Sequence, residues 1–296
     1  MSLDLDKRQR AMLREMGVRV WQPLPTPVEE ALAQAQAENA IINIAPSARP
    51  EKAAPRLDVE RPAVLPLRVS AVPALQAAPL ARPQGVDLMD WPTLQAAVAI
   101  CRACALCESR THTVFGVGPV VAGAAPAQVD WLIVGEAPGE NEDLSGEPFV
   151  GQAGMLLDNM LLALGLQRGQ GDAPPQPGLS RSIFITNVLK CRPPANRNPD
   201  PVEVAQCEPY LKRQVELLQP KMILALGKFA AQSLLQDSVP DVQKIPLGKL
   251  RGQVFRYLGV PVVVSYHPAY LLRSLGDKAK AWDDLCLALG NLKQAD

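Results

Sequence analysis

The chain has 296 residues, with 30 basic and 30 acidic side chains, and is 48% hydrophobic but only 4% aromatic. This charge balance excludes a strongly basic protein of the histone type, although a local basic groove remains compatible with it. The sequence contains no run of about 18 apolar residues, which a membrane span would require. Its charged start, MSLDLDKRQR, does not resemble a signal peptide. We therefore expect a cytoplasmic protein without a membrane anchor, with one domain of about 200 residues plus additional chain.

The first 88 residues differ in composition from the rest. Residues 1–22 predict a short amphipathic helix, with Met12, Met16 and Val20 at helical spacing. Residues 23–88 are rich in proline and alanine and predict a disordered linker. A helix on such a tether is typical of a docking peptide, although a tail without function fits equally well. The stretch LREMGVRVWQP resembles the start of the psi subunit of bacterial clamp loaders, which favours a replication or repair protein as partner.

Short aliphatic runs alternate with helical patterns in residues 89–296. Strands are predicted where β-branched or aliphatic residues lie between turn residues, at residues 131–134, 183–188, 222–226 and 262–266. Helical patterns separate most of these runs. This alternation predicts an α/β domain whose open, mostly parallel sheet is covered by helices on both faces.

Polar residues gather where the predicted strands end. Glu136 follows the first run, Asn187 ends the second, and His267 follows the fourth. Ligands bind outside the carboxyl ends of such strands, so we expect a site there. The Asn187 amide can donate and accept at once, which suits reading the edge of a base. Phe149 lies between glycines and is either a core residue or a stacking platform for a planar ligand, whereas His112 is expected to be structural.

Three of the six cysteines, Cys101, Cys104 and Cys107, lie within seven residues, and Cys191 and Cys207 follow later in the chain. Nothing marks the chain as secreted, so these thiols favour metal binding or redox work over disulfides. Four of them could hold zinc or an iron–sulfur cluster. A zinc ribbon would favour a second close pair, which is absent, so a cluster is the better interpretation. Spacing alone leaves open whether Cys107 replaces one of its neighbours.

Four segments together resemble one known family. They are GEAPGENED at 135–143, GEPFVGQAG at 146–154, ITNVLKCRPPANRNP at 185–199 and HPAYLLR at 267–273. In this order they are similar to family 4 uracil-DNA glycosylases, the iron–sulfur type of bacteria and archaea. The resemblance spans residues 93–292 and implies a three-layer α/β/α sandwich with a central four-stranded parallel sheet.

The resemblance implies a DNA repair enzyme that flips uracil out of single- or double-stranded DNA and hydrolyses its N-glycosidic bond. It implies that His267 stabilises the charge on the uracil O2 atom and that Asn187 pairs with the polar edge of the base. Backbone carbonyl groups or Glu136 are the candidates for positioning the attacking water. The remaining implied contacts are Ala137, Pro138, Glu142 and Phe149 to uracil, and Leu271, Leu272 and Arg273 to DNA.

The resemblance also implies a structural [4Fe–4S] cluster with no redox role in base removal. By motif position its ligands are Cys101, Cys104, Cys191 and Cys207. The additional thiol of Cys107 leaves open which of the two C-x2-C pairs is used.

Two other classes of function compete with this interpretation. A non-catalytic module that binds DNA or nucleotide is favoured only by Ala137, where related family 1 enzymes carry a catalytic aspartate. An electron carrier or radical enzyme is disfavoured, because C-x2-C-x2-C does not match the C-x3-C-x2-C spacing of radical enzymes. The chain also lacks the arginine-rich loop of a related branch that forms a covalent adduct, so we expect turnover by a monomer, associated with the nucleoid if the source is a bacterium.

Overall fold

The computed structural model describes residues 82–119, 129–169, 180 and 183–295. The predictions for residues 1–22 and for the linker up to residue 81 lie outside the described residues. Within the described part, the linker prediction extends too far, because Val86–Leu88 forms a 3-10 helix, η2, and Val86 is buried in the core. The packed domain therefore begins a few residues before the predicted boundary at residue 89.

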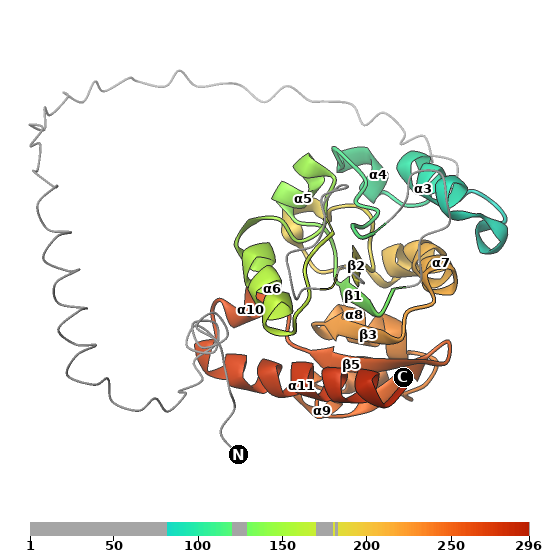
Figure 1. Ribbon diagram of the computed structural model, residues 1–296. Helices are drawn as coiled ribbons and strands as arrows, with labels where there is room; N and C mark the ends of the chain where they lie inside the picture. The colour runs from blue at the N-terminus through green and yellow to red at the C-terminus, as the bar shows by residue number, and fades with distance from the viewer. Residues whose placement is uncertain (1–81, 120–128, 170–179, 181–182, 296) are drawn as a thin grey trace, which may run out of the picture. The chain divides into compact units, whose positions relative to one another are not determined.

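The described residues form one five-stranded sheet (Figure 1). Its strands are β1 (Trp131–Gly135), β2 (Ile183–Asn187), β3 (Met222–Leu226), β4 (Val254–Tyr257) and β5 (Val260–Ser265). The order across the sheet is β2-β1-β3-β5-β4, with β2, β1, β3 and β5 mutually parallel. These four strands are the predicted ones, and the α/β class is confirmed.

The predicted count of four strands is wrong by one, because β4 pairs antiparallel with β5 at the edge of the sheet. Its sequence VFRY is short and largely exposed, so it lacks the continuous aliphatic run that marks a strand buried on both faces. Leu258 and Gly259 connect β4 to β5 with φ of 49° and 84°. Positive φ at both central residues is typical of the tight turn of a β-hairpin.

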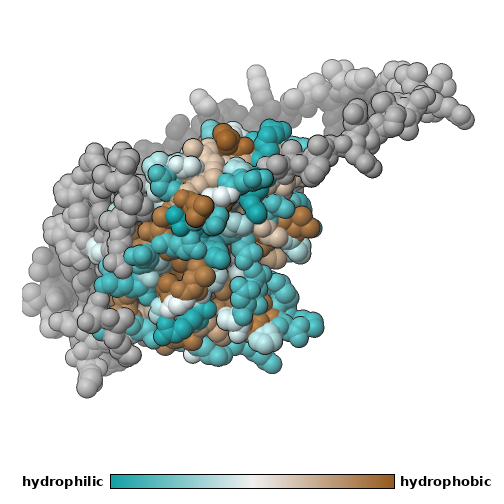
Figure 2. Space-filling model, turned by 90° about the vertical axis from the view of Figure 1, so that its right-hand side faces the viewer, coloured by the Kyte–Doolittle hydropathy of each residue, from teal (hydrophilic) through white to brown (hydrophobic). Residues whose placement is uncertain are grey.

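Helices cover both faces of the sheet (Figure 1). The longer helices are α3 (Trp91–Ile100), α6 (Gly151–Ala163), α7 (Pro201–Leu218), α8 (Lys228–Leu235) and α11 (Lys278–Ala295). The single-turn and short helices are α4 (Leu106–Ser109), α5 (Glu140–Ser145), α9 (Leu247–Leu250), α10 (Pro268–Leu271), η3 (Pro194–Asn196), η4 (Val242–Lys244) and η5 (Leu275–Asp277). No described helix is both long and apolar enough to cross a membrane. Hydrophilic and hydrophobic residues are intermixed on the face of the described part that Figure 2 shows.

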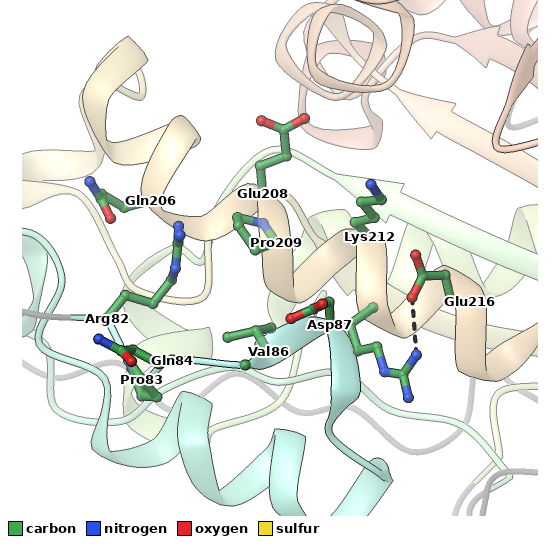
Figure 3. Close-up of a pocket in the computed structure, with 12 residues that line it drawn as sticks. Arg82, Pro83, Gln84, Val86, Asp87, Gln206, Glu208, Pro209, Lys212 and Glu216 are labelled. Atoms are coloured by element: carbon green, nitrogen blue, oxygen red, sulfur yellow. Dashed lines mark hydrogen bonds and ion pairs between the residues drawn. The ribbon is translucent and has the colours of Figure 1, made fainter.

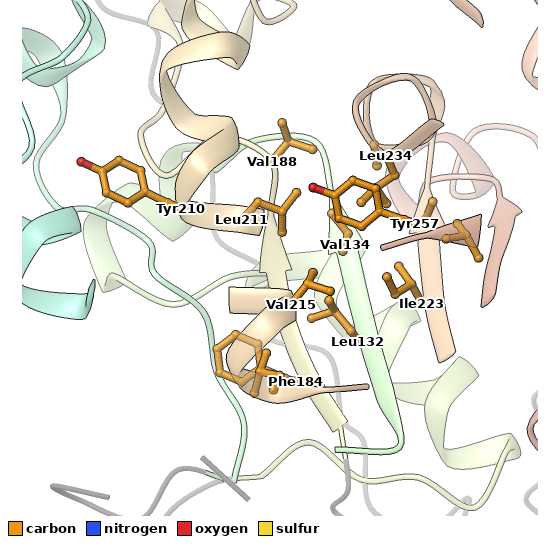
Figure 4. Packing of buried hydrophobic residues seen from close by; sticks show 14 of the residues in the cluster. Leu132, Val134, Phe184, Val188, Tyr210, Leu211, Val215, Ile223, Leu234 and Tyr257 are labelled. Carbon is orange, nitrogen blue, oxygen red and sulfur yellow. The ribbon is translucent and has the colours of Figure 1, made fainter. Parts of the chain in front are cut away.

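Each face of the sheet has its own hydrophobic core. Side chains alternate along β1, so Leu132 and Val134 join one core and Trp131 and Ile133 join the other. The first core is closed by α3, α7 and α8, and Figure 4 shows how side chains of α7 and α8 meet those of the strands. The second is closed by α6 and α11. The result is the three-layer arrangement that the alternation of runs predicts.

Local sequence explains the start of α7, which carries one of the clustered cysteines. Asp200 caps the helix by accepting a hydrogen bond from the Val202 N–H at 2.8 Å, and Glu203 accepts one from the Asp200 N–H at 2.9 Å. Pro201 occupies the first helical position, where its missing N–H costs nothing. Such reciprocal capping fixes the helix start and so the place of the residues that follow.

The order of strands positions the site. From β1 the chain moves to β2 on one side and later to β3 on the other, so the crossover connections diverge beside β1. Open parallel sheets bind ligands where connections diverge in this way. Gly135 pairs with Asn187 in the register, which places the ends of β1 and β2 at one level.

Candidate active site

A pocket of about 490 Å³ opens at the carboxyl ends of β1, β2 and β5. All the residues predicted to contact uracil line it, namely Glu136, Ala137, Pro138, Glu142, Phe149, Asn187 and His267. Arg273, predicted to contact DNA, lines it as well. Asn196, Arg197 and Tyr270 also line the pocket and were missed, although they lie inside the motif segments 185–199 and 267–273. The structure thus brings residues from four separate segments to one place.

A larger cavity of about 720 Å³ lies between η2 and α7 (Figure 3). Acidic and basic side chains both line it, and Arg213 and Glu216 form an ion pair at 3.1 Å. None of the residues predicted for the site lines this cavity. The chemistry therefore gathers in the smaller pocket at the strand ends.

Asn187 presents an unpaired acceptor in this pocket. Its side chain is 2% exposed, and its Oδ1 atom accepts no hydrogen bond from any described residue. A buried acceptor without a partner is costly, by about 1–3 kcal/mol, so its retention calls for a ligand that donates to it. Gly135 makes room for this amide, because a Cβ atom at that position would collide with Asn187 Oδ1 and lie 2.5 Å from Phe149 Cζ.

Phe149 is held in an unusual backbone conformation. Its φ of 55° lies in the left-handed region, which is uncommon outside glycine, and its side chain is buried. The ring lies nearly parallel to that of His267, with 5.4 Å between the centroids and 24° between the planes. This spacing leaves no room for a base between the two rings. A base that stacks on Phe149 therefore meets His267 with an edge rather than a face.

His267 is set up as a neutral hydrogen-bond donor. Its Nδ1 atom accepts a hydrogen bond from the Ala269 N–H at 3.2 Å at the start of α10, so the proton of the neutral ring is on Nε2. Burial, together with the charge of Arg273, lowers the pKa of His267 to about 4. The ring is therefore uncharged at pH 7. A neutral imidazole can donate to an oxygen on which negative charge develops.

Two carboxyl groups border the pocket in different surroundings. Burial raises the pKa of Glu136 to about 7, so this group changes charge near neutral pH. Glu142 accepts a hydrogen bond from the Gly139 N–H at 3.1 Å at the start of α5, which holds its carboxylate at the rim. The residue between Glu136 and Pro138 is Ala137, which offers no acid of its own.

The three residues predicted to contact DNA differ in exposure. Leu271 is fully buried in the second core, with α6 and α11, so in this conformation it cannot enter DNA. The single turn of α10 directs Leu271 inward and the neighbouring Tyr270 and Leu272 outward, each 38% exposed. A motif read without the helix could not tell which leucine faces solvent. Arg273 is exposed, as a phosphate contact requires.

The clustered cysteines meet at a second place. Cys101, Cys104, Cys107, Cys191 and Cys207 all border one small cavity between α3, α7 and the segment after β2, and none is in a disulfide. Burial raises the pKa of Cys191 to about 11 and of Cys207 to about 12, so thiolates here require a strongly positive group beside them. The donor set thus fits a metal cluster.

Two further observations concern these cysteines. In the described ranges, no three His, Cys, Asp or Glu side chains are arranged to hold a single metal ion. Arg110 donates to Cys191 Sγ at 3.1 Å and so adds positive charge beside the thiols.

Comparison with known proteins identifies the family of this chain. Residues 122–286 match the uracil DNA glycosylase superfamily. The type-4 uracil-DNA glycosylase of Archaeoglobus fulgidus is 42% identical over 176 residues, which cover 58% of this chain and 78% of that protein. Its counterparts in Pyrobaculum aerophilum and Thermotoga maritima are each 38% identical, over 68% and 61% of this chain and 94% and 82% of their own lengths. The resemblance of the four motifs is thereby confirmed, and the chain belongs to the uracil-DNA glycosylase superfamily, in its type-4 branch.

Proposed function

We propose that this chain removes uracil from DNA by hydrolysing the N-glycosidic bond, the first step of base excision repair. One observation carries the proposal: an unpartnered acceptor, Asn187 Oδ1, and a neutral donor, His267 Nε2–H, belong to the same pocket. Uracil presents N3–H as a donor beside the carbonyl oxygens O2 and O4. Asn187 Oδ1 can therefore accept from N3–H while His267 donates to O2.

The same pattern discriminates between bases. Cytosine has a lone pair at N3 and an amino group at C4, so it would oppose an acceptor to an acceptor at Asn187 and leave a buried group unpaired. Thymine differs from uracil by its C5 methyl group. Glu142, held at the rim by the Gly139 N–H, is placed to crowd that methyl group.

A base in a duplex reaches this recessed pocket only after the nucleotide is flipped out of the stack, which costs a few kcal/mol. The exposed side chain of Leu272 can fill the gap that the base leaves, and Arg273 can bind a neighbouring phosphate. Phe149 would receive the flipped base by stacking, which is typically worth about 1–3 kcal/mol per base.

Bond cleavage leaves its electron pair on uracil, as negative charge shared with O2. His267 stabilises that charge by donating from Nε2, a contribution of about 3 kcal/mol for one preorganised donor. Water attacks the sugar carbon. Because Ala137 has no carboxyl group, Glu136 in its ionised form is the pocket residue that can orient the water and accept its proton.

The cysteines would hold a [4Fe–4S] cluster through Cys101, Cys104, Cys191 and Cys207. The cluster would supply a structural cross-link and no electron to the reaction. Cys191 lies four residues after Asn187, so such a cross-link fixes the chain that leaves the pocket.

We also propose that the protein is a cytoplasmic monomer and that its residues 1–22 bind a replication or repair protein. The support comes from the sequence alone, because residues 1–22 lie outside the described residues. It consists of the amphipathic pattern of this stretch and its resemblance to the psi subunit. If deleting residues 1–22 left every co-purifying protein in place, this part of the proposal would fail.

The main test compares the two histidines of the chain. Wild type, His267→Ala and His112→Ala, each purified anaerobically, are incubated with a labelled duplex that holds one uracil, followed by alkali. We expect strand cleavage by wild type and His112→Ala and a loss of about 100-fold or more in His267→Ala. His112 is a suitable control because it is exposed and does not line the pocket, and its Nδ1 atom lies 3.0 Å from the Asp143 carbonyl oxygen. Cluster-loaded wild type that binds the duplex but never cleaves it would instead identify a binding module.

A further inference from the structure

The side chain of Arg168, distant in sequence, donates hydrogen bonds to the backbone on both sides of the Phe149 Cα atom. Arg168 Nη1 donates to the Pro148 carbonyl oxygen at 2.6 Å, and Nη2 donates to the Phe149 carbonyl oxygen at 3.0 Å. These two carbonyls belong to the two peptide planes that meet at the Phe149 Cα atom. Fixing both planes fixes φ and ψ of Phe149, including its unfavourable φ of 55°.

Arg168 is itself firmly placed. Its side chain is 8% exposed, and its Nε atom donates to Asp158 Oδ1 of α6 at 3.0 Å. The guanidinium is a rigid planar fork that spans two acceptors at once, which the single ammonium of a lysine does not. The partly exposed carboxylate of Asp158 therefore orients the Arg168 guanidinium, and the guanidinium binds the backbone of Phe149.

The surroundings of Phe149 are shaped for the same conformation. A Cβ atom at Gly154 would collide with the Phe149 carbonyl group, so the backbone of α6 lies directly against it. On the other side, Gly135 leaves space for the Phe149 ring. These glycines permit the conformation but do not hold it, because a missing side chain makes no bond. Among the described side chains, only Arg168 donates hydrogen bonds to these two carbonyls.

We infer that Arg168 is a positioning residue that acts on uracil through Phe149, by locking the backbone of that aromatic residue in the conformation that presents its ring to the pocket. The inference rests on the proposed function, in which Phe149 stacks on the flipped base. Arg168 does not line the pocket, so it has no direct contact with the substrate.

A double-mutant cycle tests this link. Uracil release is measured under single-turnover conditions on a U·G duplex for wild type, Arg168→Met, Phe149→Ala and the double variant. We expect Arg168→Met to lower the rate by about 10-fold, within the range that loss of one base stack gives. In the Phe149→Ala background the same substitution should change the rate by less than about 2-fold, because there is no ring left to position. Equal losses in both backgrounds would overturn the inference.

Two further variants guard against a general loss of structure. Arg168→Lys keeps the buried charge but cannot span both carbonyls, so we expect a loss close to that of Arg168→Met with the thermal midpoint retained. Asp158→Asn leaves both carbonyl contacts in place and should lose less than about 3-fold. If Arg168→Lys restored the wild-type rate, charge rather than the two-carbonyl grip would be responsible, and the inference would fail.

A readout without catalysis separates this inference from the proposed function. The chain has five phenylalanines, so 4-fluorophenylalanine labelling gives few fluorine NMR signals, and the Phe149 signal is assigned by its absence in Phe149→Ala. In Arg168→Met we expect this signal alone to shift or broaden. An unchanged Phe149 signal would contradict the inference even if the protein excises uracil. A wild type that releases no uracil while the signal still responds would sink the proposed function and leave the positioning role intact.

Discussion

Asn187 joins two regions of the molecule that treat buried polar atoms in opposite ways. On the core side, the Lys190 ammonium is fully enclosed and donates to Thr186 Oγ1 at 2.6 Å, to the Asn187 carbonyl oxygen at 2.7 Å and to Gln214 Oε1 at 2.7 Å. On the pocket side, the Asn187 side chain keeps an oxygen without a partner. All three N–H donors of Lys190 are hydrogen-bonded, whereas the side-chain oxygen of Asn187 has no hydrogen-bond partner.

The difference separates structure from function. A saturated buried network rigidifies the strand end, because each removed contact leaves an unpaired group behind. An open buried acceptor lowers stability and is useful only when a ligand fills it. The comparison makes opposite predictions for substitutions on the two sides of the same strand end.

The largest expected effect is on catalysis at the open side. Asn187→Leu is similar in volume and removes the unpaired acceptor, so we expect uracil excision to fall by about 100- to 1,000-fold while the thermal midpoint stays level or rises. Excision rates and thermal unfolding of the same preparation check both halves. A clear drop in the thermal midpoint would show that the amide supports the fold after all.

Substitutions in the hydrogen-bond network of Lys190 should lower the stability of the fold. Lys190→Met strands the acceptors of Thr186, Asn187 and Gln214, so we expect the free energy of unfolding to fall by about 1–3 kcal/mol. The matched control is Lys212→Met, at an exposed position of α7, which should unfold like wild type. Denaturant unfolding of cluster-loaded protein measures both variants. Equal stability of the two would mean that the buried network contributes little.

A smaller effect concerns the pH dependence at the pocket. Since burial raises the pKa of Glu136 to about 7 and the ionised form is the active one, kcat/KM should fall about tenfold per pH unit below pH 7 and level off above it. The His267 pKa of about 4 keeps that ring neutral throughout this range. Glu136→Gln should be slower and should lose this slope. If the slope persisted in Glu136→Gln, another group would be the base.

The smallest effect is expected at the extra cysteine. If Cys101 and Cys104 are the ligands from their segment, Cys107→Ser should keep its iron content, visible absorbance and excision rate within about 2-fold, whereas Cys104→Ser should lose its iron. Iron analysis after anaerobic purification distinguishes the two. The reverse result would assign Cys107 to the cluster.

The sequence predicts the parts of this molecule that repeat a strong local pattern. Four aliphatic runs predict β1, β2, β3 and β5, since strands buried on both faces need continuous apolar residues. The pocket residues follow from motifs at the strand ends. By contrast, β4 was missed because one of its faces is exposed, and the motif does not show that the turn of α10 buries Leu271.

Arg168 shows why other parts of the site cannot be predicted in this way. Its partners are backbone carbonyls 20 and 19 residues away, and a backbone acceptor leaves no mark in the amino-acid types. The open oxygen of Asn187 is invisible for a related reason. Whether a buried amide is satisfied depends on its neighbours in space, and these are fixed only when the strands align.

The pairing of Gly135 with Asn187 in the sheet has a consequence for the choice of DNA context. Because the pocket wall is part of a packed sheet, the pocket has its shape before DNA arrives, and the work of exposing the base falls on the helix. The protein then preferentially binds nucleotides whose base pair opens easily. We therefore expect uracil opposite guanine, or in a single strand, to be excised faster than uracil opposite adenine, with the difference set by the stability of the base pair rather than by any contact to the opposite base.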